Sequence, residues 1–595
     1  MSEDTLFTIR HSTAHVLAKA VMELYPSVKL GVGPVIENGF FYDIAFPEVI
    51  SEDVLPAIEA KMHEILKRKD TFRREEMSID EAIAFFKKVH QDFKVELLQD
   101  LKKKGTTKVN PEEAMDIDTA KPDVASVYYT GDFVDLCRGP HVANTSEISG
   151  AFKLTKLAGA YWRGDEKNPQ LTRIYGVAFA TQDELDAYLI MIEEAKKRDH
   201  RKLGQELDLF AFSPLVGSGL PLFTPKGTIV RKLLEDFVSK LMKPYGYSRV
   251  DIPHMAKVDL YKTSGHYEKF ADDIFHVSSK KSDDEFIMKP MNCPHHTQIY
   301  ASRPRSYRDL PIRYSEVTKV YRDENTGQLA GLSRVRSITQ DDAHIFCTLE
   351  QVKQEALNIY EIITQFYAKF DMPLRIRLSV HDPKYMEKYL GSNETWETSV
   401  GILRNVLDGL KKEYEVGVGE AAFYGPKIDF IAKDAIGREW QLATIQLDFN
   451  LPERFELEYA DADGTKKRPV MVHRAISGSL ERFMSVLIEH YAGAFPLWLA
   501  PVQVRLAPVG EAHLAFCEKL KGELVELDVR VDLDDSGDKV GAKIRRSAGE
   551  KIPWTLVIGD KEVGGEPFNV RVFGQEEALD LDRTALIVEL KKHAI

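Results

Sequence analysis

Cysteine and histidine, the residue types that bind zinc, occur in three short strings in the second half of the chain. MNCPHH contains Cys293, TQDDAHIFC contains His344 and VHRAISGSLERF contains His473. The three residues lie far apart in sequence, so spacing alone does not show that they meet. A single buried cysteine or histidine more often packs in a core than binds a metal. Three protein ligands would leave a coordination position open, which is typical of a functional rather than a structural zinc site.

A second group of the same residue types lies near the amino terminus. HSTAH places His11 and His15 one helical turn apart on one face, and VDLCRGPH supplies Cys137 and His141. HxxxH together with CxxxH suits a zinc site, and it suits a metal-free catalytic pocket as well. The spacing leaves both interpretations open.

Composition limits the kinds of protein that can carry these groups. The 595 residues are 44% hydrophobic and 29% charged, an ordinary globular balance, and the net charge is −13. A passive nucleic-acid coat would be basic, although a local basic run at residues 196–202 could still contact RNA. Four cysteines are too few for a disulfide scaffold of this length and indicate a reducing compartment. The sequence has neither a signal-peptide pattern nor an apolar run of membrane-spanning length, so we expect a cytoplasmic protein without membrane contact.

The secondary-structure pattern predicts an α+β multidomain chain with four regions. Residues 1–180 mix helix and strand signals, and residues 181–206 form a helical linker, with one long helix expected over 183–206. In residues 207–498, consecutive short strands without intervening helices predict an antiparallel sheet, with a helix from 228 to 242 and a strand up to Pro253. Residues 499–595 alternate strands and helices, which predicts an α/β domain with a largely parallel sheet.

Two long strings, RVRSITQDDAHIF and HRAISGSLERF, are highly specific, and nearly the whole chain resembles the threonyl-tRNA synthetase family in its order of segments. This resemblance implies a class II synthetase core between an amino-terminal editing domain and a carboxy-terminal anticodon-binding domain. It also implies a ligase that uses ATP, L-threonine and tRNA(Thr). Cys293, His344 and His473 fall on the positions of the family's zinc ligands, so one Zn²⁺ per subunit is expected.

The resemblance gives this zinc a role in recognition. Threonine and valine are nearly isosteric, and a hydrophobic pocket separates such a pair by only ~10². Zinc can bind both the amino group and the side-chain hydroxyl of threonine, which valine lacks. Asp342 is expected to accept the hydrogen bond of that hydroxyl, and Gln340 and Tyr424 match other amino-acid contacts of the family.

The string YRDENTGQLAGLSRVR resembles motif 2 of class II synthetases, which binds ATP. Arg322 would hold the α-phosphate and the substrate carboxylate, and Glu324 would recognise the adenine amino group. The resemblance implies that Arg334 and Arg482 bind the outer phosphates with help from Mg²⁺, and that Gln441 contacts the ribose. The chain has neither a Walker A sequence nor a Rossmann glycine fingerprint, so ATP use is inferred from the resemblance. One departure is that Ser337 and Ile338 stand where the family commonly has an aromatic residue stacked on adenine.

The amino-terminal quartet resembles the editing domain of the same family, which is regarded as working without metal. Serine lacks only one methyl group relative to threonine, a difference of ~1–3 kcal/mol, so a hydrolytic site for seryl-tRNA is expected. His11 and Lys94 would activate or orient water, and Tyr42 is a weaker candidate. The residues expected to shape the pocket are His15, Asp135, Cys137 and His141. From the position of His11 in this sequence, the form of the family without the small domain that precedes the editing domain is expected.

The last region resembles the anticodon-binding domain of several class II synthetases. Its expected base contacts are Arg545, Lys551, Glu562 and Arg571, although each could equally be a solvated surface charge. Residues 226–253 match the helix and strand at the family's two-fold interface, so a homodimer is expected.

Three other functions share parts of this sequence pattern. The combination of Cys293, His344 and His473 with an HxxxH editing domain argues against another class II synthetase, such as the prolyl or histidyl enzyme. A stand-alone deacylase would not contain an intact synthetic core. A catalytically silent RNA-binding regulator on the same fold would have lost an arginine of motif 2 or motif 3 or a zinc ligand, and none is lost.

Overall fold

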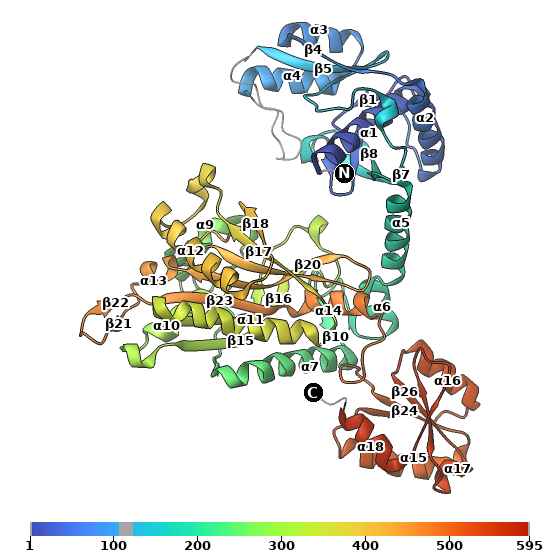
Figure 1. Cartoon of the computed structure of the whole chain (residues 1–595), viewed down its shortest axis with the longest axis vertical. Helices are drawn as coiled ribbons and strands as arrows, with labels where there is room; N and C mark the ends of the chain where they lie inside the picture. The colour runs from blue at the N-terminus through green and yellow to red at the C-terminus, as the bar shows by residue number, and fades with distance from the viewer. Residues whose placement is uncertain (1–2, 106–122, 593–595) are drawn as a thin grey trace. The chain divides into compact units, whose positions relative to one another are not determined.

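The computed structural model describes residues 3–105 and 123–592, and the chain divides into two compact units, Met1–Glu193 and Glu194–Ile595 (Figure 1). Within the described ranges, every helix is too short or too polar to cross a lipid bilayer.

The first unit contains two antiparallel sheets with four helices. The larger sheet has the order β1-β3-β8-β7, with β2 paired to β3, and its strands are β1 (Lys29–Leu30), β2 (Val35–Ile36), β3 (Gly39–Ala45), β7 (Phe152–Tyr161) and β8 (Gln170–Ala178). The smaller sheet consists of β4 (Phe72–Ser78), β5 (Val124–Thr130) and β6 (Phe133–Leu136). The helices are α1 (Glu3–Leu24), α2 (Leu55–Arg68), α3 (Ile79–Lys88) and α4 (Asp92–Lys104). Small and apolar residues of α1, such as Ala14, Leu17 and Val21, are buried against the larger sheet, and this packing fixes the histidines on the same helix.

The expected single helix over residues 183–206 is wrong, because the structure has two helices there. These are α5 (Gln182–Lys197) and α6 (His200–Glu206). Asp199 separates them with a non-helical backbone (φ −47°, ψ 118°), and its carboxylate accepts a hydrogen bond from the backbone N–H of Arg201 at 2.8 Å. An aspartate that caps a new helix in this way ends the preceding one.

The second unit is built on an eight-stranded sheet in the order β11-β15-β16-β23-β20-β19-β17-β18. Its strands are β11 (Ser248–Arg249), β15 (Ile312–Tyr321), β16 (Ser337–Cys347), β17 (Leu374–Val380), β18 (Glu415–Val418), β19 (Lys427–Lys433), β20 (Glu439–Asp448) and β23 (Val470–Ser479). All pairs are antiparallel except the two at the edges, β11 with β15 and β17 with β18. The expected antiparallel core is therefore present, although the strand expected to reach Pro253 is confined to the two residues of β11.

Helices cover this sheet and supply much of the core. They include α7 (Pro225–Met242), α10 (Cys293–Ala301), α11 (Val352–Ala368), α12 (Asn393–Leu410) and α14 (Leu480–His490). Thr224 caps α7, since its hydroxyl accepts a hydrogen bond from the N–H of Gly227, and Pro225 occupies the first helical position. Short helices also belong to this part of the chain, namely α8 (Val258–Ser264), α9 (His266–Lys269) and α13 (Asn450–Arg454). A three-stranded sheet consists of β12 (Met255–Lys257), β13 (His276–Val277) and β14 (Phe286–Met288). Two strand pairs are β9 (Phe210–Ala211) with β10 (Leu222–Phe223) and β21 (Tyr459–Ala460) with β22 (Lys466–Lys467).

The carboxy-terminal part of the second unit has a mixed sheet rather than the largely parallel one expected. Its order is β25-β24-β26-β27-β28, and the strands are β24 (Val504–Pro508), β25 (Val531–Leu533), β26 (Trp554–Ile558), β27 (Phe568–Val572) and β28 (Leu579–Leu581). β24 pairs with β25 and β26 in parallel, whereas β26, β27 and β28 are antiparallel to one another. The helices are α15 (Leu514–Val525), α16 (Val540–Gly549), α17 (Asp560–Val563) and α18 (Arg583–Lys592). The short α17 is too small for a crossover, so β27 returns beside β26 in the opposite direction.

Candidate active site

Cys293, His344 and His473 come together on one face of the large sheet. The register of β16 and β23 places His344 directly opposite His473, and Cys293 is the first residue of α10. The three possible ligand atoms all lie within 4.8 Å of one another, and all three residues are buried. The arrangement can therefore hold a metal ion with three protein ligands.

The two histidines are oriented by contacts behind the cluster. Nε2 of His473 lies 2.9 Å from a carboxylate oxygen of Asp448, and Nδ1 of His344 lies 2.8 Å from Nδ1 of His296. These contacts leave Nδ1 of His473 and Nε2 of His344 for a ligand. Hydrogen-bonded partners of this kind are common behind metal-binding histidines.

Burial sets the protonation of the cluster. It lowers the pKa of His344 well below its usual range, and the neighbouring His473 and His296 add to this shift. Burial also raises the pKa of the Cys293 thiol well above its ordinary value, with Asp342 and Asp448 contributing in the same direction. A neutral imidazole is ready to bind a metal, whereas the thiol would lose its proton only if a cation compensated the new charge.

The expected amino-acid contacts surround the same cluster. Gln340, Asp342 and His344 alternate along β16 and therefore share one face of the sheet. Asp342 accepts a hydrogen bond from the side-chain amide of Asn292 at 3.0 Å, and Oε1 of Gln340 is buried without a hydrogen-bond partner among the described residues. The ring of Tyr424 stacks on His473 with 4.9 Å between centroids. These polar groups line a position beside the possible metal ligands.

His266 is a further residue of this cluster that the sequence analysis missed. It is fully buried at the start of α9, and its Nε2 lies 3.5 Å from Sγ of Cys293. Its Nδ1 lies 2.9 Å from the hydroxyl of Ser264, and its ring packs against Phe423 and Phe270. It stands in the string SGHYEKF, which contains no metal-binding spacing, so only its position in the fold relates it to Cys293.

The candidate ATP residues occupy the ends of β15 and β16, the loop between them and the start of α14. Arg322 follows β15, and its guanidinium lies over the ring of Phe270 at 4.9 Å. Nε of Arg322 is buried and has no hydrogen-bond partner among the described residues. Burial lowers the pKa of Arg322, because a buried cation has lost its hydration, and an anionic ligand could compensate this loss.

Arg334 and Arg482 face the same region from the loop and from α14. Burial lowers the pKa of Arg482, and the positive charge of Arg334 lowers it further. Arg334 also forms an ion pair with Glu324 at 2.7 Å. Adjacent guanidinium groups of this kind can bind a polyphosphate.

Gln441, the expected ribose contact, and Ile338, the departure from the family's aromatic residue, both have neighbours on the sheet. Gln441 is exposed on β20 and accepts a hydrogen bond from Arg377 at 2.6 Å. Ile338 lies near the start of β16, opposite Val320 of β15, so an aliphatic side chain occupies this part of the sheet.

The amino-terminal residues form a separate pocket in the first unit. Its lining includes His11, His15, Tyr42, Lys94, Asp135 and Cys137. His11 and His15 come from α1, Tyr42 from β3, Lys94 from α4 and Asp135 from β6. His141 lies beside the pocket, where its Nε2 is 3.3 Å from Sγ of Cys137.

A buried polar network forms the base of this pocket. Lys94 Nζ lies 2.6 Å from Asp135 and 3.0 Å from the hydroxyl of Tyr42, which also donates a hydrogen bond to Asp135. Sγ of Cys137 lies 3.3 Å from Nε2 of His11. Burial lowers the pKa of His11, and burial with the charges of His11 and Lys94 lowers that of His15 well below its usual range. Burial also raises the pKa of Cys137 to about 12, so the pocket offers neutral imidazoles and a protonated thiol at neutral pH.

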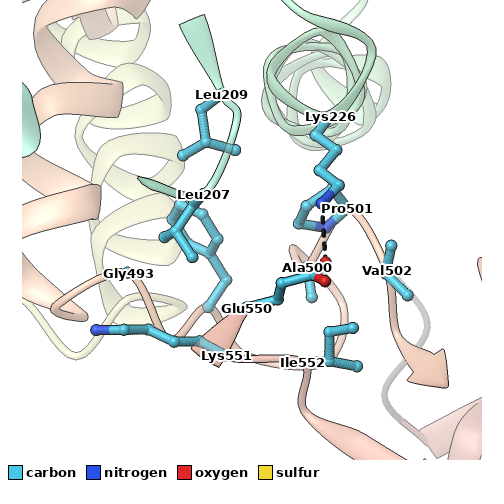
Figure 2. Close-up of a pocket in the computed structure, with 11 residues that line it drawn as sticks. Leu207, Leu209, Lys226, Gly493, Ala500, Pro501, Val502, Glu550, Lys551 and Ile552 are labelled. Atoms are coloured by element: carbon cyan, nitrogen blue, oxygen red, sulfur yellow. Dashed lines mark hydrogen bonds and ion pairs between the residues drawn. The ribbon is translucent and has the colours of Figure 1, made fainter. Parts of the chain in front are cut away.

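The expected anticodon contacts divide into two kinds. Arg545 and Arg571 are exposed on α16 and β27, and Glu562 caps α17 by accepting a hydrogen bond from the N–H of Gly559 at 2.8 Å. Lys551 instead lines a small pocket at the junction with the large sheet domain, as Figure 2 shows.

The amine of Lys551 donates a hydrogen bond to the carbonyl oxygen of Ala492, and burial lowers its pKa. In the same pocket Lys226 of α7 pairs with Glu550 at 3.0 Å (Figure 2). The amine of Lys551 is thus occupied within the chain, and an anticodon role for it stays a prediction.

Three family descriptions match the chain. They are the tRNA synthetase class II core domain (G, H, P, S and T) over residues 275–491, the threonyl and alanyl tRNA synthetase second additional domain over residues 125–175, and the anticodon binding domain over residues 503–593. With the antiparallel core and its three facing arginines, these matches identify a class II aminoacyl-tRNA synthetase.

Individual relatives narrow this class. The chain is 48% identical over 570 residues to the threonine–tRNA ligase of Deinococcus deserti, which covers 94% of this chain and 84% of the relative. It is also 48% identical over 576 residues to that of Thermosynechococcus vestitus, covering 96% and 92%. A solved RNA binding domain of threonyl-tRNA synthetase from Cryptosporidium parvum superposes with a TM-score of 0.64 at 34% identity, covering 67% of this chain and 98% of that one. The chain belongs to the threonyl-tRNA synthetase family.

Proposed function

We propose that this protein activates L-threonine with ATP and transfers the threonyl group to tRNA(Thr), as a threonine–tRNA ligase. The observation that carries this proposal is the buried set of Cys293, His344 and His473, whose two histidines lie on the sheet that also contains β15, the strand that Arg322 follows. Similarity to threonine–tRNA ligases over nearly the whole chain supports it.

Zinc fits the site at Cys293, His344 and His473. One thiol and two imidazoles are suitable ligands, their atoms lie within 4.8 Å, and each histidine has a partner at its other ring nitrogen. One Zn²⁺ per subunit would supply a Lewis acid with open coordination positions for the amino and hydroxyl groups of threonine. Asp342 would then accept the hydrogen bond of the substrate hydroxyl, and Gln340 and Tyr424 would make the other contacts to the amino acid.

Activation of threonine requires charge stabilisation at the α-phosphate. A carboxylate oxygen of threonine attacks the α-phosphorus, and the bond to the pyrophosphate leaving group breaks. Arg322 would bind the α-phosphate and the carboxylate, while Arg334 and Arg482 would bind the outer phosphates. Glu324 would recognise the adenine amino group and Gln441 the ribose. The reaction of ATP implies Mg²⁺ on the phosphates. A terminal hydroxyl of tRNA then attacks the threonyl carbonyl, and AMP leaves.

The first unit would hydrolyse seryl-tRNA(Thr). Water attacks the ester carbonyl, and the tRNA hydroxyl leaves with a proton. His11 would accept a proton from water, because its lowered pKa keeps the imidazole neutral at physiological pH. Lys94, paired with Asp135, would orient this water, and His15, Asp135, Cys137 and His141 would shape the pocket. The proposed regions are 1–180 for editing, 181–206 as linker, 207–498 for synthesis and 499–595 for the anticodon. Exposed Arg545 and Arg571 and half-buried Glu562 are the candidates for base contact. A homodimer through residues 226–253 completes the proposal.

Amino-acid-dependent exchange between ATP and pyrophosphate tests the function, using threonine, serine, valine and proline on protein of measured zinc content. We expect exchange with threonine, weaker exchange with serine, essentially none with valine and about one zinc per chain. Folded, zinc-loaded protein that gives no exchange with threonine would favour the silent RNA-binding regulator.

A further inference from the structure

A junction of three segments lies beside the candidate ATP residues, and His200 is at its centre. His200 is the first residue of α6 and is only 5% exposed. Its Nε2 accepts a hydrogen bond from the backbone N–H of Leu332 at 3.0 Å, and its Nδ1 lies 2.6 Å from Glu489. Leu332 belongs to the loop between β15 and β16, and Glu489 belongs to α14. One imidazole therefore joins the loop that carries Arg334 to the helix that carries Arg482.

The hydrogen bonds define the protonation of this imidazole. A backbone N–H can only donate, so Nε2 of His200 must be the acceptor from Leu332. The proton of a neutral ring then lies on Nδ1, which donates to Glu489. The backbone N–H of His200 donates to the same carboxylate oxygen at 3.0 Å. Arg438 pairs with the other oxygen of Glu489 at 2.6 Å and fixes the carboxylate in this orientation.

The loop is shaped to receive the ring. Gly331 has a left-handed backbone (φ +54°), and a Cβ atom at this position would lie 2.3 Å from Nε2 of His200. Leu332 is fully buried in the core of the sheet domain. A second link joins the same two elements, because the hydroxyl groups of Ser333 and Ser485 lie 2.9 Å apart. The loop is thus held at two successive residues.

A metal ion does not explain this group, although Asp199, His200 and Glu489 lie within ligand distance of one another. Both ring nitrogens of His200 already have hydrogen-bond partners. Asp199 pairs with Arg201 and caps α6, and Glu489 pairs with Arg438. The atoms of Asp199, His200 and Glu489 that could coordinate a metal are therefore already engaged by partners within the chain.

We propose that His200 is a positioning residue for ATP, which holds the loop of Arg334 in register with Arg482 on α14. This inference rests on the proposed use of ATP by these arginines. Binding a polyphosphate between two elements requires that their charges keep a fixed separation, since a displacement of ~1 Å in a positioned group can cost ~10²-fold in rate. The test therefore separates the two hydrogen bonds of the ring.

Two substitutions each keep one of the two hydrogen bonds of the His200 ring and remove the other. His200→Asn places an amide donor near the position of Nδ1 and keeps the bond to Glu489, but it is too short to reach Leu332. His200→Gln places an amide oxygen near the position of Nε2 and keeps an acceptor for Leu332. Affinity for ATP with Mg²⁺ is measured by calorimetry, and KM values for ATP and threonine come from pyrophosphate exchange.

We expect His200→Asn to weaken ATP binding and raise KM for ATP about tenfold, the size of effect expected when a buried donor loses its partner. KM for threonine and zinc content should stay close to the parent values, whereas Tm should fall modestly because the buried N–H of Leu332 loses its acceptor. His200→Gln should recover most of the loss. His490→Asn is the matched control, since His490 follows Glu489 on α14 and bonds the backbone of Ala435 and Phe370 instead of the loop, and asparagine can keep the bond to the N–H of Ala435.

Unchanged ATP affinity in His200→Asn would overturn the inference. So would an equal loss of ATP, threonine and zinc affinity together with Tm, because that pattern indicates a general structural role. If the parent protein binds ATP but gives no exchange with threonine, the proposed function fails while the calorimetric comparison still decides the role of His200. A parent protein that binds no ATP overturns both.

Discussion

Asp448→Asn should weaken zinc binding without changing the size of the side chain. Asp448 is fully buried on β20, and one of its oxygens lies 2.9 Å from Nε2 of His473. Its other oxygen accepts hydrogen bonds from the N–H groups of Asn450 and Leu451 at 2.7 and 3.0 Å. Asparagine can keep these two bonds through its own oxygen, but its amide nitrogen then faces His473.

Two donors would face each other unless the proton of His473 moved to Nδ1. That shift would remove the lone pair that the proposed zinc site needs. Loss of a partner behind a metal ligand typically costs about 10- to 100-fold in metal affinity, which is about 1.4 to 2.7 kcal/mol. Because the site is fully buried, we expect a loss in this range rather than the small effect of a surface pair.

Zinc affinity would be measured by competition with a chromogenic chelator, and exchange with threonine would be followed on the same samples. The matched control is Asp429→Asn, a buried carboxylate on β19 that pairs with Lys427 and Ser379 instead of a candidate ligand. Zinc affinity equal to that of the parent, with only a lower Tm, would show that Asp448 serves to cap the turn at Asn450 and would refute the reasoning.

Three further predictions concern the editing pocket and the loop. His11→Ala should leave threonine charging intact while seryl-tRNA(Thr) accumulates, and no rise in serine mischarging would exclude the editing role. The pKa values of His11 and His15 are lowered from 6.5, so both imidazoles stay neutral as the pH falls through that value. The rate of seryl-tRNA deacylation should therefore be constant from about pH 8 to 6.5 and decline only at lower pH. A half-maximal rate above pH 6.5 would contradict this. Gly331→Ala should raise KM for ATP at least as much as His200→Asn, since it strains the backbone and collides with the ring of His200; wild-type ATP affinity would show that the loop can move away.

Local patterns were sufficient to predict several parts of the site. HSTAH indicates two histidines on one face of a helix, and the ring centroids of His11 and His15 lie 5.4 Å apart. Consecutive strands without helices gave the correct prediction of an antiparallel core. In each case the relevant residues lie within one element, where the helical or strand period decides which side chains point the same way.

Contacts between different helices and strands could not be predicted from such local patterns. The pairing of His344 with His473 depends on the register of β16 and β23, which is fixed by packing along the whole sheet. The break at Asp199 was missed because the charged pattern of residues 183–206 continues across it, and this break starts the helix that presents His200. The direction of β27 was missed for a similar reason, since a strand's own sequence says little about its partner.

The two cysteine and histidine clusters differ in what lies behind their rings, and this difference bears on metal binding. Histidines that bind metals usually give their second ring nitrogen a hydrogen-bond partner. Asp448 and His296 provide such partners for His473 and His344. In the amino-terminal pocket, Nδ1 of His15 is buried without a hydrogen-bond partner among the described residues. Nε2 of the same ring lies 3.8 Å from Asp135, which is already engaged by Lys94. The carboxylate that could orient His15 for a metal thus holds a lysine instead, although the hydroxyl of Ser12 lies 3.2 Å from Nδ1 of His141. The imidazoles of the amino-terminal cluster are therefore less completely oriented for a metal than His344 and His473.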